Sequence, residues 1–125
     1  MQTLEGITEI AVLPSTRTLF VRTTGDLTIS NSTAARNEIR AAWDERPDLN
    51  AVILDLWETR HLDSSGVGTL LELASHAGKS GFTLRLCHVQ PSPRRLLDRT
   101  GLSSMFEIYE TVEAGLHNIP REEGK

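Results

Sequence analysis

The first quarter of the chain contains two short runs of apolar and other β-forming residues, at residues 7–13 and 18–24. Residues 14–17 between them begin with a proline and are otherwise polar. Two such runs joined by a short turn predict a β-hairpin. The hydrophobic pattern therefore places an antiparallel pair of strands at the start of the fold.

The spacing of apolar residues becomes helical after a loop at residues 25–28. Three polar residues that commonly cap helices come first: Ser30, Asn31 and Ser32. The apolar residues that follow lie on one side of a helix: Ala35, Ile39, Ala42 and Trp43. We expect an amphipathic helix here, which Pro47 ends.

A nearly continuous apolar run occupies residues 51–57, in the middle of the chain. Such a run is typical of a strand that is covered on both faces, as in a parallel sheet. A helix is expected after the polar run at residues 63–66, and Gly78 or Gly81 ends it. Its apolar face is formed by Val67, Leu70, Leu71 and Ala74. Alternation of apolar and polar residues over 82–88 predicts another strand.

The C-terminal third adds a helix, a short strand and a second helix. Ser92 and Pro93 are typical of a helix start, and Gly101 is typical of a helix end. Residues 106–109 are expected to form a short edge strand, and Thr111 to cap the last helix.

The predicted order of elements is β-β-α-β-α-β-α-β-α. Helices that alternate with strands imply crossover connections and a largely parallel sheet. The 125 residues are enough for one domain and too few for two. We predict one α/β domain over residues 1–119, with a mixed, mainly parallel sheet of four to five strands flanked by about four helices. Residues 120–125 are expected to be a disordered polar tail.

The composition narrows the classes of function. The chain has 13 Lys and Arg residues and 17 Asp and Glu residues, which gives a net charge of -4. This charge disfavours a nucleic-acid-binding domain, which would carry a basic surplus. No apolar run approaches the roughly 18 residues that span a bilayer. Residues 1–5 lack the basic and apolar segments of a secretory signal. The single cysteine, Cys87, suits a reducing compartment. We expect a cytoplasmic protein with no membrane insertion and no direct contact with nucleic acid.

No catalytic constellation is found, so we expect no enzyme, no metal and no cofactor. The Gly-x-Ser-x-Gly elbow of serine hydrolases is absent around Ser64 and Ser65, and residues 66–68 lack the Lys of a phosphate-binding loop. No metal-ligand spacing relates the four histidines, His61, His76, His88 and His117. A phosphoryl-accepting receiver domain is excluded because no acidic pair ends an early strand and Asp55 lies inside an apolar run.

The other reactive or aromatic side chains are interpreted as packing or surface residues. Cys87 is expected to be an inert thiol, packed or half-exposed. Trp43 and Trp57 are expected to be core or half-buried, and Arg94 and Arg95 to lie on a solvated helix face.

The most informative motif is Leu-Asp-Ser-Ser-Gly-Val-Gly at residues 62–68, between a buried strand and an amphipathic helix. Asp63 or Ser64 is the natural N-cap, which places the serine hydroxyls in the first turn. Helix capping alone is the simplest interpretation. A phosphorylation switch also fits, because a helix N-terminus tolerates a phosphate of about -1.5 to -2 charges. The neighbouring carboxylate of Asp63 would repel that phosphate.

Four sequence blocks, in this order, resemble a known family: residues 21–27, 52–56, 62–68 and 93–102, the last followed by Phe106. Together they resemble the STAS domains of bacterial anti-sigma factor antagonists. The resemblance implies a STAS-like α/β fold and a protein that switches partners. The unphosphorylated form would bind an anti-sigma factor that is itself a serine kinase, and would so free a sigma factor.

The resemblance also implies site residues. The kinase would phosphorylate Ser64, and a PP2C-type serine phosphatase would reverse this. Asp63, Ser65 and Gly66 would be neighbours of the phosphate, and Gly66 would let the helix start run close to the partner. The implied partner surface comprises Gly25, Asp26, Leu27, Thr28, Ser64, Ser65, Val67 and Gly68.

The chain departs from the family pattern at two positions. Thr28 stands where an Asp is common, and His61 where an apolar residue is common. The first departure leaves open whether the partner is a classical kinase. Two alternatives remain at this point, a STAS component of a lipid-transport ATPase complex and a component of a stress-signalling scaffold. Either would be a binding module without the kinase switch.

Overall fold

The computed structural model describes residues 2–3 and 8–119. Its elements in chain order are β1 (Gln2–Thr3), β2 (Thr8–Leu13), β3 (Thr18–Thr23), α1 (Ser32–Asp44), β4 (Ala51–Asp55), α2 (Ser64–Ser80), β5 (Arg85–Cys87), α3 (Pro91–Arg99), the 3-10 helix η1 (Ser103–Met105), β6 (Glu107–Tyr109) and α4 (Val112–Gly115). The expected order is confirmed, with β1 and η1 in addition. The predicted tail at residues 120–125 lies outside the described residues.

All six strands form one sheet, and their order in space is their order in the sequence. β1, β2 and β3 are antiparallel, whereas β3, β4, β5 and β6 are parallel. The predicted mixed, mainly parallel sheet is therefore confirmed. β1 exceeds the predicted four to five strands because two residues are too few to leave a periodic pattern.

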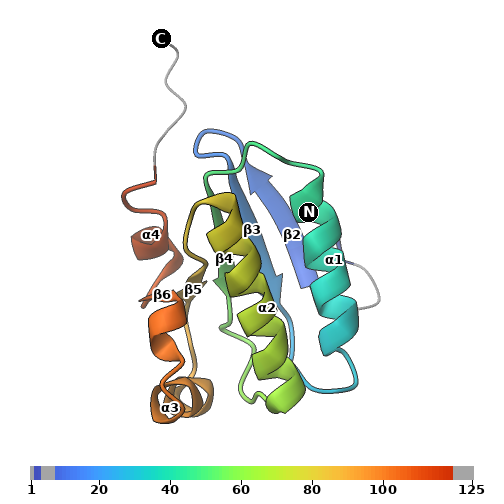
Figure 1. The fold of residues 1–125 in the computed structure, drawn as a ribbon, viewed down its shortest axis with the longest axis vertical. Coiled ribbons are helices and arrows are strands. Elements are labelled where there is room, and N and C mark those ends of the chain that lie inside the picture. Colours follow the sequence, from blue (N-terminus) through green and yellow to red (C-terminus); the bar gives the residue numbers. More distant parts are fainter. Residues whose placement is uncertain (1, 4–7, 120–125) are drawn as a thin grey trace.

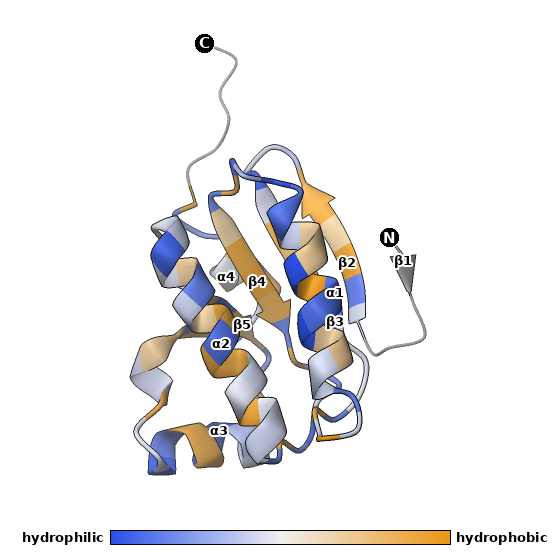
Figure 2. Cartoon of the chain, turned by 45° about the vertical axis from the view of Figure 1, so that its right-hand side comes forward, coloured by the Kyte–Doolittle hydropathy of each residue, from blue (hydrophilic) through white to orange (hydrophobic). Residues whose placement is uncertain are grey.

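The helices cover the two faces of the sheet unequally. α1 and α2 lie side by side over one face (Figure 1), and α4 packs against β4, β5 and β6 on the other. Successive residues of β4 point to opposite faces, so Leu54 belongs to the larger core and Ile53 to the smaller one. β4 is consequently hydrophobic along almost its whole length, whereas hydrophobic and hydrophilic residues alternate along α1 and α2 (Figure 2).

Two strands are shorter than predicted by two residues or more. β4 ends at Asp55 because the carboxylate of this residue accepts a hydrogen bond from the backbone N–H of Trp57 (3.0 Å), which turns the chain. β5 is limited to Arg85–Cys87, because both of its neighbours pair only with these three residues. The apolar run at 51–57 therefore continues past the end of the strand.

The two tryptophans have different environments. Trp43 is 4% exposed and stacks on Phe82, with 5.8 Å between ring centroids, so its predicted place in the core is confirmed. Trp57 is 61% exposed, and its interpretation as a packing residue is wrong. Cys87 is buried as expected, and burial raises the pKa of its thiol to about 12.

Candidate functional site

Ser64 is the first residue of α2 and lies in the connection that follows the carboxyl end of β4. β3 is the parallel neighbour of β4, so the loops that follow the two strands leave the sheet at the same edge. Leu27 in the first loop and Leu62 in the second form an isolated parallel bridge. The structure thus brings together the two segments from which the sequence predicted the site.

Side chains from both loops fasten these segments to each other. Oδ1 of Asp26 accepts hydrogen bonds from the backbone N–H groups of Arg60 (2.8 Å) and His61 (3.1 Å). The hydroxyl of Thr59, a fully buried residue, donates to the carbonyl of Gly25 (2.8 Å). Three hydrogen bonds therefore join the loop after β3 to the loop after β4.

Of the two predicted N-cap candidates of α2, Asp63 and Ser64, the structure has Asp63. Its Oδ1 accepts from the N–H of Gly66 (3.0 Å) and its Oδ2 from the N–H of Ile29 (2.9 Å). These two hydrogen bonds, with that of Gly66 first, lower the pKa of the Asp63 carboxyl below its ordinary value of 3.8. One ionised carboxylate therefore caps the helix and holds the neighbouring loop.

The start of α1 is closed differently from the prediction. Asn31 occupies the N-cap position but makes no side-chain cap. Its Oδ1 instead accepts from the N–H of Thr28 (3.0 Å), and its Nδ2 donates to the carbonyl of Asp26 (2.9 Å). The hydroxyl of Thr28 accepts from the N–H of Ser30 (3.2 Å). Thr28 stands where the family pattern commonly has an Asp, and it fixes this loop through its backbone N–H and its hydroxyl.

Ser64 is exposed and Ser65 half-buried. Within the part of the chain that the structure describes, no hydrogen bond engages the hydroxyl of Ser64. The cap of α2 is Asp63, so this hydroxyl is not needed to close the helix. The hydroxyl of Ser65 is likewise without a hydrogen bond among the described residues, so exposure is what separates the two serines, and Ser64 is the more accessible.

The expected role of Gly66 needs correction. Gly66 is buried, and a methyl group on it would lie 2.4 Å from the carbonyl oxygen and 2.9 Å from Cβ of Leu27. The glycine lets α2 approach the chain's own loop, not a partner. Leu27 is 2% exposed, so its side chain belongs to the core. Gly68, in contrast, is exposed and has no atom within 4 Å of such a methyl group.

Ile29 is the residue of this surface that the sequence reasoning missed. Its side chain is 78% exposed, although its backbone is fixed by Asp63. The signal was an aliphatic residue between Thr28 and Ser30, in a segment interpreted only as loop and cap. Ile29 is therefore an exposed aliphatic side chain whose backbone is attached to the residue that precedes Ser64.

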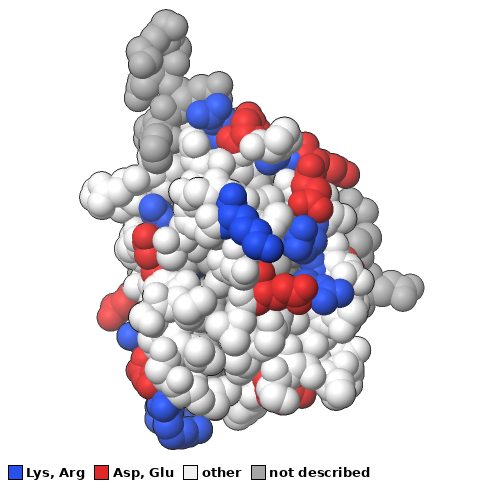
Figure 3. Space-filling model, in the orientation of Figure 1, with Lys and Arg blue, Asp and Glu red and all other residues white. Residues whose placement is uncertain are grey.

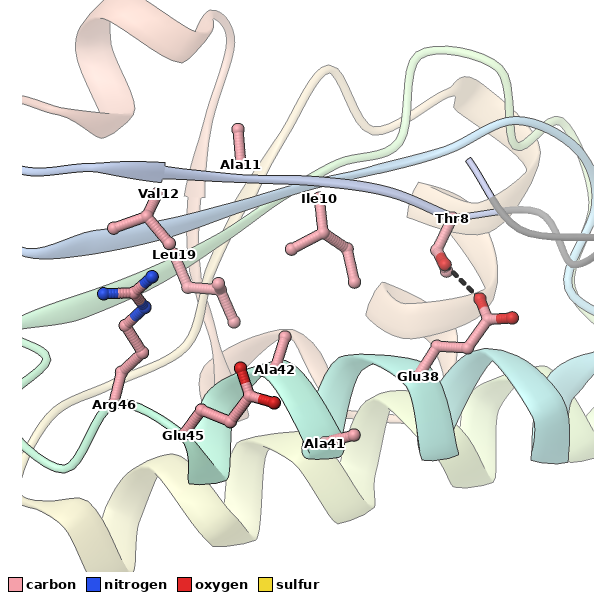
Figure 4. A pocket seen from close by; sticks show the side chains of 10 residues that line it. All are labelled: Thr8, Ile10, Ala11, Val12, Leu19, Glu38, Ala41, Ala42, Glu45 and Arg46. Carbon is pink, nitrogen blue, oxygen red and sulfur yellow. Dashed lines mark hydrogen bonds between the residues drawn. The ribbon is translucent and has the colours of Figure 1, made fainter. Parts of the chain in front are cut away.

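No metal centre emerges in the described residues, where no group of three or more His, Cys, Asp and Glu side chains converges. Nor does any described helix have the length and apolar character needed to cross a membrane. A groove of about 700 Å³ lies between β2 and α1, with Ile10, Val12 and Ala42 inside it and Thr8 hydrogen-bonded to Glu38 at one end (Figure 4). It contains none of the predicted site residues.

Fold and site together describe a small α/β module with the exposed hydroxyl of Ser64 at the start of a helix that Asp63 caps. Comparison with known sequences gives the family. The family model described as "STAS domain" matches residues 9–115, and the chain belongs to the STAS domain family. The resemblance inferred from the four sequence blocks is confirmed.

Relatives include regulators of sigma factors. Over 92 residues, 74% of this chain and 78% of the relative, the chain is 32% identical to the anti-sigma F factor antagonist of Paenibacillus polymyxa. Its fold is similar to that of an anti-sigma factor antagonist from Mycobacterium paratuberculosis, with a TM-score of 0.75 and 24% identity over 90% of this chain and 92% of that one. It is also similar to the phosphorylated form of the Bacillus cell fate determinant SpoIIAA, with a TM-score of 0.64 and 20% identity over 86% and 95%.

Proposed function

We propose that this chain is an anti-sigma factor antagonist that binds an anti-sigma factor when Ser64 is unmodified and releases it when Ser64 is phosphorylated. The observation that carries the proposal is the exposed, unbonded hydroxyl of Ser64 at the start of a helix that Asp63 already caps. The 32% identical relative named as an anti-sigma F factor antagonist supports it.

Charge supplies the switch. A phosphate on Ser64 would add about -1.5 to -2 charges at pH 7. Next to it stands the carboxylate of Asp63, whose lowered pKa keeps it ionised and whose Oδ1 already occupies the N–H of Gly66. The phosphate therefore has a negative neighbour and remains on the open surface, where it repels or blocks the partner. No rearrangement of the core is required.

The partner surface follows from the exposure of the predicted residues. The side chain of Ile29 and the exposed positions Ser64 and Gly68 face outward, whereas Asp26 and Leu27 act from beneath by holding the loop. We assign the kinase activity to the anti-sigma factor and removal of the phosphate to a PP2C-type phosphatase. We place the switch in the cytoplasm, where sigma factors act.

The test is a pairwise binding and phosphorylation screen against each anti-sigma factor encoded in the same genome. We expect one of them to bind the wild type and, with ATP, to add one phosphate that tandem mass spectrometry locates on Ser64. Ser64→Ala should bind without being modified, and the matched variant Ser65→Ala should still be modified. Ser64→Asp should lose at least tenfold in affinity while keeping its unfolding midpoint.

Three results would contradict the proposal. These are binding to none of the anti-sigma factors, modification of Ser65 in place of Ser64, and undiminished binding by Ser64→Asp. Specific co-purification with a lipid-transport ATPase or a stress-signalling scaffold would favour the alternative modules instead.

A further inference from the structure

A large aromatic side chain stands exposed on the loop that leads to Ser64. Trp57 is 61% exposed, but its backbone is fixed at both ends of the residue. Its N–H donates to Oδ1 of Asp55 (3.0 Å), and its carbonyl accepts from the side-chain amide of Gln90. The indole meets the ring of His88 edge-on, with 5.5 Å between centroids. The side chain is thus held in place without being covered.

A buried carboxylate supports this arrangement. Asp55 is 2% exposed and lies at the carboxyl end of β4. Besides the N–H of Trp57, it pairs with Nε of Arg22 (3.3 Å) and Nδ1 of His88 (3.0 Å). Three groups from different parts of the chain therefore converge on the carboxylate of Asp55. A side chain positioned in this way loses little conformational entropy when a partner covers it.

A cavity of about 470 Å³ opens beside the indole. Besides Trp57 its lining includes Val89, Ile108 and Tyr109, with Arg94 and Glu110 adding charge of both signs. Pockets for small molecules usually bury 70–90% or more of their ligand, whereas a wall that is itself 61% exposed cannot enclose one. The site is better suited to one apolar side chain presented by a larger body that also covers the indole.

The cavity and the serine belong to one surface. The loop from Trp57 to Asp63 joins them, and the hydrogen bonds of Thr59 and Asp26 fasten that loop to its neighbour. The loop between Trp57 and Ser64 is therefore attached to its neighbour at Thr59, Arg60 and His61. The lower half of the face in Figure 3, which contains the start of α2, is mainly uncharged. A charge-poor area is typical of the centre of a protein interface, and the charged residues Arg94 and Glu110 lie at the cavity beside Trp57.

We infer that Trp57 and its cavity form a second contact for the anti-sigma factor, taking an aliphatic or aromatic side chain of that partner. This inference rests on the proposed function and extends its surface beyond Ser64 and Ile29. Truncation of a tryptophan is among the substitutions that weaken binding most in protein interfaces. Because the phosphate is on Ser64, the contact at Trp57 strengthens binding in both phosphorylation states by the same factor.

The experiment compares variants against the anti-sigma factor that the pairwise screen identifies. We expect Trp57→Ala to weaken binding by tenfold or more, and Trp57→Phe to retain most of it. The control is Met105→Ala, which removes another exposed apolar side chain (45%) from η1, the helix that leads into the opposite end of β6; it should change nothing. The ratio between wild-type and Ser64→Asp affinities should be the same with and without Trp57.

A spectroscopic measurement separates contact from folding. Labelling with fluorotryptophan gives two ¹⁹F resonances, one for each tryptophan, and Trp57→Phe assigns them. Titration with the unlabelled anti-sigma factor should shift the resonance of Trp57 and leave that of buried Trp43 in place.

This inference alone would be overturned if Trp57→Ala bound the anti-sigma factor as tightly as the wild type does. It would also be overturned if the wild type bound the anti-sigma factor without a shift of the Trp57 resonance. Failure of the wild type to bind any anti-sigma factor would overturn the proposed function, and this inference with it. A shift of the Trp57 resonance by a small metabolite and not by the anti-sigma factor would mean a small-molecule site and would also overturn it.

Discussion

Replacing Gly66 by alanine tests whether α2 starts in direct contact with the loop after β3. The added methyl carbon would lie 2.4 Å from the carbonyl oxygen of Leu27 and 2.9 Å from its Cβ. Leu27 cannot move aside, because it is 2% exposed and its carbonyl accepts from the N–H of Asp63 (3.3 Å). The start of the helix must shift instead, by roughly 1 Å if ordinary van der Waals separation is to be restored.

The expected loss of stability is the sum of two costs less one gain. Overpacking a buried position costs about 1–3 kcal/mol, and the shift also disturbs the capping hydrogen bond between Asp63 and the N–H of Gly66 (3.0 Å). Alanine in place of glycine in a helix returns roughly 0.5–1 kcal/mol. We therefore expect Gly66→Ala to lower the free energy of unfolding by about 1–3 kcal/mol.

The matched control is Gly68→Ala, two residues further along the same helix. No atom lies within 4 Å of its added methyl group, so this variant should gain up to about 1 kcal/mol. Urea unfolding of both variants measures the two changes, which should have opposite signs and unchanged m-values. Equal stability of Gly66→Ala and Gly68→Ala would refute the packing argument, and Gly66 would then have to be explained by the partner surface.

Two further predictions concern ionisable groups. Asp63→Asn removes a carboxylate with a lowered pKa, whose stabilising contribution is present above pH 3.8 and is lost as the pH falls through its lower folded value. Unfolding measured from pH 7 to pH 2 should therefore show a free energy of unfolding below that of the wild type at pH 7, and this difference should disappear in acid. A difference that stays constant with pH would mean that only packing is affected. The thiol of Cys87, with a pKa raised to about 12, should not react with a disulfide reagent at pH 8 until urea unfolds the chain, and rapid reaction of the folded protein would contradict its burial.

Asp63 shows how one residue links the two halves of the site. As a neighbour of Ser64 in the sequence it would be assigned only to capping and to repulsion of a phosphate. The structure adds its second oxygen, which holds the backbone of Ile29 at 2.9 Å. The phosphate that we propose on Ser64 would therefore lie next to the carboxylate that holds the backbone of Ile29.

The sequence by itself determined the class of fold, the order of most elements and the helix start that carries Ser64. These follow from local physics: apolar period, capping side chains, and glycine or proline at element ends. The N-cap role of Asp63 is also local, because its side chain accepts a hydrogen bond from Gly66, only three residues further along the chain.

Only the tertiary structure decided what each site residue faces. Gly66 and Leu27 are 39 positions apart along the chain, yet they are in contact. This contact shows that Gly66 is required by packing within the chain, whereas the sequence had suggested an approach to a partner. The apolar run at 51–57 could not show that Trp57 lies beyond the strand, because its exposure depends on Asp55, Gln90 and the end of β4. Burial is set by residues distant in sequence, and a local pattern does not contain them.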